Sequence, residues 1–535
     1  MPRSALLVGA GLVTMLVRSG AGPSASTPEA PVTVAPARMA RVAAVDPRYQ
    51  SYNVEMVEVT GGRFWKPYPA SAPASAERTA ATPAPPRSGT PTGVNPDLFE
   101  YRPPIDLTNP RLRKLAAALG PAYVRVSGTW ANTTYLPDAD EAPQSPPAGF
   151  NGVLARSQWK GVVEFARAVD AEIVTSMATS AGTRAEDGAW TPAQARRFLE
   201  YTKSVGGRIA AAEFMNEPNF ASIGGAPPGY DAAAYARDFK VFREFVRQAA
   251  PDLLILGPGS VGEQASGGLG SGSIRTIGTR ELLAAGGTGV DGFSYHHYGT
   301  VSRRCAGPGV PTTSPEEALS EAWLSRPDET LAFYKSLRDG FEPGKPIWLT
   351  ETADAACGGN PWASSFLDTF RYLDQLGRLA RQDVRVVAHN TLVASDYGIL
   401  EESDFRPKPK YWGALVWRRL MGTTVLDPGI PSRAGLHTYA HCLQGRPGGV
   451  ALLLINTDKT AAQSVTLPTP AERYTLSATD PVARRADLNG TELRLGADDS
   501  LPRLDGAPIP AGALTLSPAT ITFVAVPGAE NPSCR

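Results

Sequence analysis

The sequence lacks an excess of charge of either sign. Its 535 residues include 52 Lys and Arg and 52 Asp and Glu, so the formal net charge is zero. Nucleic-acid binding is driven by clustered positive charge, so this balance argues against a protein whose main partner is nucleic acid. The same balance disfavours a broad basic face for a highly sulfated polymer. With 42% hydrophobic residues, however, the chain is able to bury a sizeable core.

Signature motifs of several enzyme classes are also missing. No GxGxxG follows the first predicted strand, as a dinucleotide-binding fold would require, and no GxSxG nucleophile turn is present. The chain has no CxxC or His/Cys spacing typical of zinc. Only five histidines occur, and the adjacent His296 and His297 would face opposite sides of a strand. We therefore predict neither a metal nor an organic cofactor.

Cysteine is scarce but even in number, with four residues in the chain. Four cysteines allow three pairings, and the sequence alone does not choose among them. The pairs Cys305 with Cys357 and Cys442 with Cys534 would each stay inside one predicted domain. The alternative is four free, buried thiols.

The N-terminus predicts export. A short basic start, Met1–Arg3, precedes an apolar run over Ala5–Leu16, and small residues follow up to Ala25. This pattern is typical of a signal peptide spanning residues 1–25, with an uncleaved hydrophobic N-terminus as the alternative. No later segment reaches about 18 uninterrupted apolar residues, so we expect no membrane span. We expect a secreted or periplasmic protein that acts as a monomer.

Residues 49–422 alternate strand-like apolar runs with amphipathic helical stretches. Eight such units in series predict an α/β fold, a (β/α)8 TIM barrel. Two helix starts carry a capping hydroxyl and proline, at Thr191–Gln194 and Ser314–Glu317. The predicted strands are Tyr52–Val59, Tyr123–Val126, Glu172–Ser176, Ile209–Asn216, Leu253–Gly257, Gly292–Tyr298, Pro346–Thr350 and Val384–Ala388.

Residues 423–535 change to short strands separated by turn residues, which predicts a C-terminal antiparallel β-sandwich. The N-terminal segment, residues 26–48, contains short strand-like runs that could add a strand to this sandwich. Between Lys66 and Pro96 lies a stretch rich in Pro, Ala, Ser and Thr without periodicity. It is either a loop beside the active site or a solvent-exposed insertion.

Two glutamates follow predicted barrel strands at equivalent places. Glu217 lies in Asn216-Glu217-Pro218 after the fourth strand, and Glu351 follows the seventh. Active sites of such barrels lie at the carboxyl ends of the strands, so both carboxyl groups should project over one mouth. Such a pair suits glycoside hydrolysis, in which one carboxylic acid protonates the leaving oxygen and one carboxylate attacks the sugar. The alternative is two unrelated glutamates at strand ends.

Beyond this pair, the chain resembles glycoside hydrolase family 79, the heparanases and related β-glucuronidases, within the large clan of barrel glycosidases. The resemblance covers roughly residues 45–535. The matching stretches are Pro121–Thr129, Tyr295–Tyr298, Glu351-Thr352, Gly358-Gly359, Tyr397–Leu400, Tyr411–Leu415, Gly422-Thr423 and Pro518–Cys534.

This resemblance implies a role for each matching position. Glu217 would be the acid/base and Glu351 the nucleophile, and Asn216 would hydrogen-bond the sugar 2-hydroxyl. Backbone amides of Gly358 and Gly359, with Tyr397, would hold a uronate carboxylate. The remaining predicted substrate-binding residues are Glu55 on the first strand, Thr129 after the second, and His296 and Tyr298 on the sixth.

Arg125 on the second strand is a predicted supporting residue. It would lie beneath the site and stabilise an ionised Glu351. Alternatively, it would form a structural pair with Glu213 inside the barrel.

From these features we expect a retaining glycoside hydrolase that acts on glucuronic acid-containing glycans or glycosides. Its partner would be that carbohydrate, with no nucleic acid. One alternative is another barrel glycosidase of the same clan, an arabinofuranosidase or xylosidase. A second is a carbohydrate-binding protein with an inactive barrel, although both intact carboxyl groups argue against it.

Overall fold

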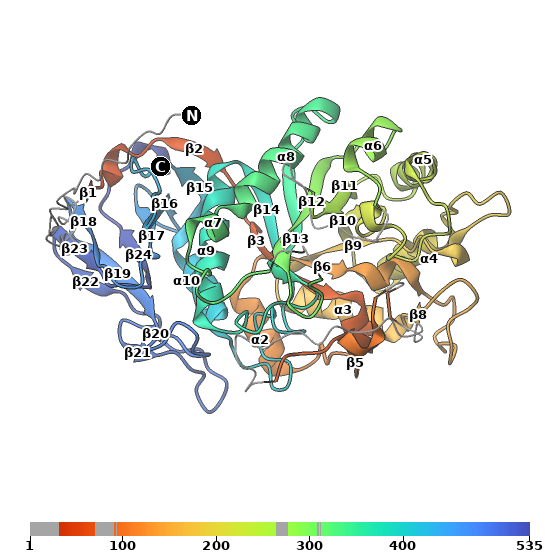
Figure 1. Cartoon of the computed structure of the whole chain (residues 1–535), viewed down its shortest axis with the longest axis horizontal. Helices are drawn as coiled ribbons and strands as arrows, with labels where there is room; N and C mark the ends of the chain where they lie inside the picture. The colour runs from red at the N-terminus through yellow and green to blue at the C-terminus, as the bar shows by residue number, and fades with distance from the viewer. Residues whose placement is uncertain (1–31, 70–89, 92–93, 264–275, 308–309, 311) are drawn as a thin grey trace, which may run out of the picture.

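The computed structural model describes residues 32–69, 90–91, 94–263, 276–307, 310 and 312–535. The predicted signal peptide and most of the stretch Lys66–Pro96 lie outside these residues. In Figure 1, a β-rich domain lies on the left and an α/β domain on the right. No helix within the described ranges is long and apolar enough to cross a membrane.

Eight parallel strands close into a barrel, which confirms the predicted fold. Around the ring they follow the order of the chain, and the last strand pairs in parallel with the first. The strands are β3 (Gln50–Glu55), β6 (Ala122–Ser127), β9 (Ala171–Ser176), β10 (Ile209–Glu213), β11 (Leu254–Val261), β12 (Gly292–Val301), β13 (Ile347–Ala356) and β14 (Val384–His389).

Helices cover the outside of the barrel, one main helix after each strand (Figure 1). Two short helices, α1 (Met56–Thr60) and α7 (Glu321–Leu324), add to these. The main helices are α2 (Pro110–Ala118), α3 (Arg156–Ala168), α4 (Ala193–Ser204), α5 (Ala232–Ala249), α6 (Thr279–Ala284), α8 (Arg326–Phe341), α9 (Phe366–Arg381) and α10 (Pro409–Leu420).

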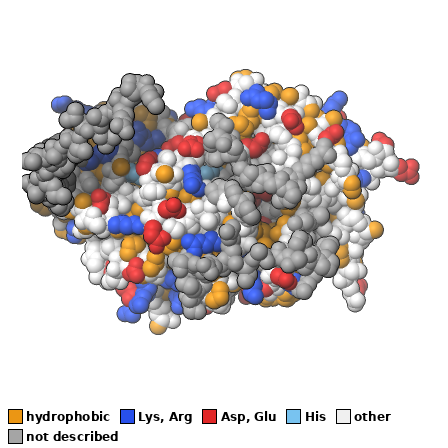
Figure 2. Space-filling model, in the orientation of Figure 1, with side chains coloured by type: hydrophobic (Ala, Val, Ile, Leu, Met, Phe, Trp, Pro, Cys, Tyr) orange, Lys and Arg blue, Asp and Glu red, His pale blue; other side chains and the backbone are white. Residues whose placement is uncertain are grey.

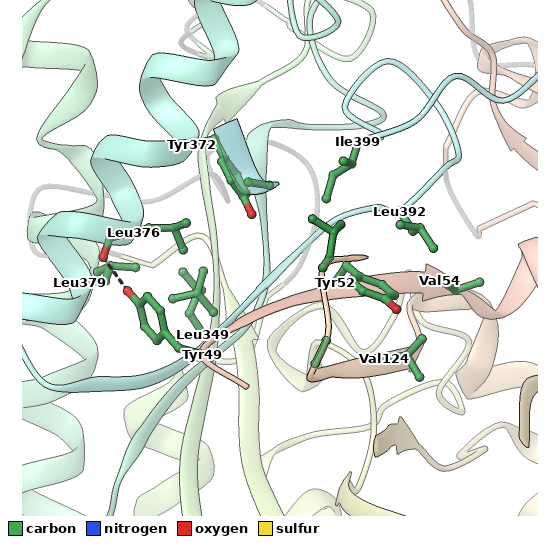
Figure 3. Packing of buried hydrophobic residues seen from close by; sticks show 14 of the residues in the cluster. Tyr49, Tyr52, Val54, Val124, Leu349, Tyr372, Leu376, Leu379, Leu392 and Ile399 are labelled. Carbon is green, nitrogen blue, oxygen red and sulfur yellow. Dashed lines mark hydrogen bonds between the residues drawn. The ribbon is translucent and has the colours of Figure 1, made fainter. Parts of the chain in front are cut away.

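Helix α9 is buried along nearly its whole length because it lies between the barrel and the β-rich domain. Figure 3 shows how the first strand of the barrel is joined to it: the phenol of Tyr49, next to β3, donates a hydrogen bond of 2.6 Å to the carbonyl oxygen of Leu376. The side chains of Tyr52 and Val54 continue this apolar packing along β3.

Two local predictions were wrong. The strand predicted over Tyr52–Val59 ends at Glu55, because the Glu55 N–H donates to the carboxylate of Glu58 and this capping box starts helix α1. At Ser314–Glu317 the Ser314 N–H also donates to a glutamate, Glu317. That contact closes only a turn, and the next helix, α7, begins at Glu321.

The C-terminal domain consists of two packed sheets, as predicted. Figure 1 shows it beside α9 and α10. The larger sheet contains β2 (Arg41–Ala44), β15 (Met421–Leu426), β16 (Leu436–Leu443), β17 (Val450–Asn456), β24 (Thr520–Val526), β19 (Ala471–Ser477), β20 (Asp487–Leu488), β21 (Thr491–Glu492) and β22 (Ala507–Ile509). The smaller contains β1 (Val32–Thr33), β18 (Gln463–Leu467) and β23 (Gly512–Leu516).

Both faces of the larger sheet are buried. Leu452 and Val524 pack toward the smaller sheet, whereas Leu453 and Phe523, on the opposite face, join the barrel core. Strands β17 and β24 are therefore buried at every residue instead of at alternate ones.

The segment from Val32 to Ala44 belongs to the sandwich, although it precedes the first barrel strand in the sequence. Strand β1 pairs in parallel with β18, and β2 pairs antiparallel with β15, so the segment adds one strand to each sheet. Two disulfides form, Cys305 with Cys357 beside the barrel and Cys442 with Cys534 in the sandwich. Two short ribbons complete the chain, β4 (Gly62–Trp65) with β5 (Phe99–Arg102), and β7 (Thr134–Tyr135) with β8 (Gly152–Val153).

Buried polar groups join the sandwich to the barrel. On β16, His437 Nδ1 lies 2.6 Å from Asp374 Oδ1 of α9, and Nε2 lies 2.8 Å from Glu321 Oε2. Burial alone would lower the pKa of His437, but the charge of Asp374 and the hydrogen bonds to both acids outweigh it and raise the pKa to about 9. His437 is therefore a cation at neutral pH.

This contact predicts a pH-dependent stability. Because the folded pKa of His437 exceeds its ordinary value of 6.5, its contribution is complete below pH 6.5 and is lost as the pH rises toward about 9. We expect His437→Gln to lower the free energy of unfolding at pH 6 by about 2 kcal/mol and to flatten that alkaline decline. Denaturant unfolding at pH 6, 7.5 and 9 measures both.

The matched control is His441→Gln on the same strand, because burial lowers the pKa of His441 to about 4 and the ring stays neutral throughout this range. An alkaline decline that persists unchanged in His437→Gln would refute the assignment.

Candidate active site

Glu217 projects from a sharp turn at the carboxyl end of the barrel. Strand β10 ends at Glu213, three residues before the predicted Asn216. Glu217 has a left-handed backbone with φ 49°, and the turn Pro218–Phe220 begins directly after it. A glutamate in this conformation is uncommon outside functional sites.

Glu351 lies within β13, which continues to Ala356 instead of ending at the predicted Thr350. Its partner on the neighbouring strand β12 is His296. One carboxylate oxygen of Glu217, one of Glu351 and one ring nitrogen of His296 all lie within 4.8 Å of one another. The structure thus brings together the two glutamates that the sequence analysis paired.

Arg125 lies buried beneath both glutamates, with 1% of its surface exposed. Its Nη1 donates to Glu351 Oε2 at 2.8 Å, and its Nε and Nη2 donate to Glu213 Oε2 at 3.1 and 2.9 Å. Nη2 also donates to Asn216 Oδ1 at 2.8 Å. The two alternative placements of Arg125, under the site and paired with Glu213, are therefore both realised.

His296 is fully buried, and both of its ring nitrogens contact protein atoms. Nε2 lies 3.2 Å from Arg125 Nη2, and Nδ1 lies 3.0 Å from Glu217 Oε1. Burial, reinforced by the charge of Arg125, holds the pKa of His296 well below its ordinary value. A guanidinium only donates, so Nε2 of the neutral ring accepts and Nδ1–H donates to Glu217. His296 thus orients the Glu217 carboxyl group.

Tyr298 and Asn390 form the opposite wall around Glu351. The Tyr298 phenol donates to Glu351 Oε1 at 2.5 Å. Asn390 Nδ2 donates to Tyr298 Oη and Glu55 Oε1, both at 3.0 Å, and to Tyr397 Oη at 3.3 Å. The Asn390 amide thus contacts three residues predicted from the sequence, Glu55, Tyr298 and Tyr397. It is linked to the fourth, Glu351, through the Tyr298 phenol.

Asn390 is a site residue that the sequence analysis missed. It directly follows His389, the last residue of β14. The rule that found the glutamates, a polar residue at the carboxyl end of a barrel strand, would also have found Asn390.

Glu55 is a third carboxyl group in the site, with 4% of its surface exposed. Burial raises its pKa well above the ordinary value, and the charge of Glu351 raises it further. Gly128, with φ 89°, makes room for it: a Cβ there would lie 1.6 Å from Glu55 Oε2. Any side chain at this position would displace Glu55.

Gly358 and Gly359 are buried and held through their carbonyl oxygens. The Gly358 carbonyl accepts from Ser395 Oγ at 2.9 Å and from the Asp396 N–H at 3.1 Å. The Gly359 carbonyl accepts from Ser302 Oγ at 2.6 Å. Among the described residues, neither glycine N–H donates a hydrogen bond to a protein atom. Buried N–H groups without a partner are rare, so these two are available to a ligand.

Thr129 begins the turn Thr129–Thr133 that follows β6. With Trp130, Ile223 and Gly225 it lines a cavity of about 20 Å³ beside the turn that carries Glu217. No hydrogen bond within the described ranges links Thr129 to either glutamate.

Glu217, His296 and Glu351 also have the residue types that bind metals. However, the Arg125 guanidinium contacts both Glu351 and His296, and its charge repels a cation from the same place. The arrangement suits acid–base and nucleophilic chemistry by carboxyl groups better than metal binding.

Glu217 and Glu351 lie among different charges and hydrogen-bond donors. Burial raises the pKa of Glu217 well above its ordinary value, and the negative charge of Glu351 raises it further. Glu351 accepts hydrogen bonds from the Arg125 guanidinium and the Tyr298 phenol, whereas Glu217 contacts the neutral ring of His296. Glu217 is thus the group that holds a proton.

This electrostatic coupling predicts that Glu351→Gln lowers the pKa of Glu217, because the substitution removes a negative charge but keeps the shape of the side chain. Difference infrared titration of the Glu217 carboxyl band measures the shift, with Glu217→Gln used to assign the band. Glu172→Gln, on the exposed side of β9, is the control. An unchanged Glu217 titration in Glu351→Gln would show that the two groups are not coupled.

Comparisons with known proteins identify the family of the chain. The N-terminal domain of glycosyl hydrolase family 79 matches residues 104–377, just over half of the chain. Heparanase-like protein 1 of Arabidopsis thaliana is 29% identical over 372 residues, covering 66% of this chain and 65% of that protein, just under two thirds of its length. Heparanase of Mus musculus is 26% identical, covering 80% of this chain and 88% of its own. Hyaluronoglucuronidase of Hirudo nipponia is 24% identical, covering 81% and 92%.

Solved structures share the fold. A 4-O-α-L-rhamnosyl-β-D-glucuronidase from Fusarium oxysporum superposes with a TM-score of 0.58 at 16% identity, covering 78% of this chain and 91% of that one. A family 51 α-L-arabinofuranosidase from Thermotoga petrophila gives 0.60 at 15% identity, covering 92% and 99%. These structures show the fold alone, whereas the match of the family's N-terminal domain to just over half of the chain shows that the chain belongs to glycosyl hydrolase family 79.

Proposed function

We propose that the protein is a retaining β-glycosidase that releases glucuronic acid, or a close uronic relative, from a glycan or glycoside. Membership of family 79 and relatives named heparanase and hyaluronoglucuronidase support this proposal. The observation that carries it is that the buried N–H groups of Gly358 and Gly359, beside Tyr397, have no hydrogen-bond acceptor in the part of the chain that the structure describes.

These donors suit the carboxylate of a uronic acid. A carboxylate accepts several hydrogen bonds at once, and charge-assisted bonds are the stronger ones. Burial raises the pKa of Tyr397 well above its ordinary value, so its phenol stays protonated and able to donate. Tyr397 is joined to Glu351 through Asn390 and Tyr298. A sugar whose anomeric carbon faces Glu351 would therefore have its carboxylate within reach of the same donors.

Two glutamates at this spacing support a double displacement. Retaining glycosidases have carboxyl groups about 5–5.5 Å apart, whereas inverting enzymes leave about 6.5–9.5 Å for a water molecule. The oxygens of Glu217 and Glu351 lie within 4.8 Å, which favours retention.

In the first step, Glu351 attacks the anomeric carbon while protonated Glu217 gives its proton to the departing oxygen. In the second, Glu217 takes a proton from water as that water displaces Glu351 from the sugar. His296 would orient Glu217 through both steps. The Asn216 side-chain amide faces the same centre, because Arg125 binds its Oδ1, and Nδ2 is left to donate to the sugar 2-hydroxyl.

The charge distribution favours substrates with few sulfate groups. On the face shown in Figure 2, Lys and Arg side chains are scattered among acidic ones, in keeping with the zero net charge of the chain. We also propose that the protein acts outside the cytoplasm as a monomer. Its two disulfides suit an oxidising compartment.

Substrate comparison tests this function. We expect turnover of an aryl β-glucuronide to exceed that of the matching β-glucoside, β-xyloside and α-arabinofuranoside, because only the first offers a carboxylate to Gly358, Gly359 and Tyr397. Tyr397→Phe should raise KM for the glucuronide about tenfold, since it removes one hydrogen bond to a charged group, and should change the glucoside constants little.

Tyr201→Phe is the matched control, because the Tyr201 phenol donates to the Arg156 carbonyl on the outside of the barrel. Preferential turnover of a pentoside would assign the chain to a different specificity. A complete lack of turnover would favour a binding protein.

A further inference from the structure

The disulfide Cys305–Cys357 lies directly beside the two free amides. Cys357 immediately precedes Gly358, and Cys305 lies in the loop that follows β12. The disulfide therefore ties the loop after β12 to the loop after β13. Within the described ranges, the Cys357 carbonyl accepts no hydrogen bond.

The direction of each glycine N–H depends on how the carbonyl of the preceding residue is held. In a planar trans peptide the carbonyl and the following N–H point in opposite directions, so holding one aims the other. The Gly359 N–H is aimed by the Gly358 carbonyl, which Ser395 and Asp396 hold. The Gly358 N–H lacks such an anchor, because the Cys357 carbonyl accepts no hydrogen bond from a described residue. The disulfide of Cys357 is the covalent restraint next to that peptide.

An ion pair next to the disulfide holds the second glycine. Arg304 Nη2 lies 2.6 Å from Asp396 Oδ2 and 3.4 Å from the Gly359 carbonyl oxygen. The Arg304 guanidinium lies 4.0 Å from the centre of the Tyr68 ring, and the Tyr68 N–H donates to Asp396 at 3.2 Å. Arg304 thereby connects the loops that carry Gly359 and Tyr397, because Asp396 directly precedes Tyr397.

Close packing leaves the glycines little room to move. A Cβ on Gly358 would lie 2.6 Å from both Ser395 Oγ and the Cβ of Trp65. A Cβ on Gly359 would lie 3.0 Å from the Tyr397 N and 3.1 Å from Asp354 Oδ1. The orientation of the amides is therefore set by the neighbours that hold this loop in place.

We propose that the Cys305–Cys357 disulfide and the Arg304–Asp396 ion pair are positioning elements that determine specificity for a sugar carboxylate. They act through Gly358 and Gly359 and touch no substrate themselves. The inference rests on the proposed function, since it requires that these amides bind the uronate. The reacting glutamates are held separately, by Arg125, His296 and Tyr298, so loss of the disulfide should weaken uronide binding and leave the chemical step unaffected.

The test compares two double variants, Cys305→Ser with Cys357→Ser, and Cys442→Ser with Cys534→Ser. For the first, we expect KM for an aryl β-glucuronide to rise about tenfold with kcat within about twofold of the wild type. The constants for the matching β-glucoside should change little, so the preference for the glucuronide falls in parallel. The second variant should show a lower unfolding temperature and an unchanged KM, because its disulfide lies in the sandwich.

Arg304→Gln provides an independent variant in which the disulfide remains. We expect it to raise KM for the glucuronide as well, again with kcat near that of the wild type. If the Cys305 and Cys357 double variant fails to fold, KM of the wild type before and after thiol reduction of its disulfides tests the disulfide, and Arg304→Gln tests the ion pair.

Two outcomes separate this inference from the function on which it rests. A wild-type enzyme without any preference for the glucuronide over the glucoside refutes the proposed function and the inference together. A wild-type enzyme with that preference, combined with wild-type KM values in the folded variants at Cys305–Cys357 and Arg304, refutes the inference alone.

Discussion

The buried guanidinium of Arg125 connects four strands of the barrel beneath the two glutamates. From β6 it contacts Glu213 at the end of β10, Asn216 just beyond it, His296 on β12 and Glu351 on β13. A buried cation is costly unless it is fully paired, and here two carboxyl groups share it. Its removal would leave both carboxyl groups without a counter-charge, so the geometry of the site and the state of each acid depend on this one side chain.

The two glutamates have different contacts with the Arg125 guanidinium. Glu351 contacts the guanidinium directly, whereas Glu217 contacts it through the neutral ring of His296. Burial and the nearby charge of Glu351 raise the pKa of Glu217. The chemistry thus depends on the burial of these groups, because in bulk water neither the difference between the two glutamates nor the hydrogen bonds around His296 would persist.

Chemistry and specificity are placed on different parts of the fold. The glutamates and their supports lie on or next to barrel strands, where backbone pairing determines their positions. The groups assigned to the uronate, Gly358, Gly359 and Tyr397, lie on loops beyond β13 and β14, held by a disulfide and an ion pair. With such a division, substitutions in the loops are able to change substrate specificity while the strand residues that carry out the reaction stay the same.

The sequence predicted the parts of the site that follow from strand geometry. Pro218 and the parity of residues along β6 placed Glu217 and Arg125, because these signals act over a few residues. Contacts between distant segments could not be predicted, such as those of the buried His296 ring with Arg125 and Glu217. The local capping box of Glu55 and Glu58, at which β3 ends and helix α1 begins, was missed. The family resemblance implied that the Gly358 and Gly359 amides bind a carboxylate, but only the structure shows that neither N–H donates to a protein atom among the described residues.

The most direct test of the account is to identify the residue that becomes attached to the sugar. The protein is incubated with 2-deoxy-2-fluoro-β-glucuronosyl fluoride, whose fluorine slows the breakdown of a glycosyl-enzyme, and then digested and analysed by mass spectrometry. We predict one adduct per chain, on Glu351, with loss of activity in proportion to labelling. An adduct on Glu55 or Glu217, or inactivation without any adduct, would contradict it.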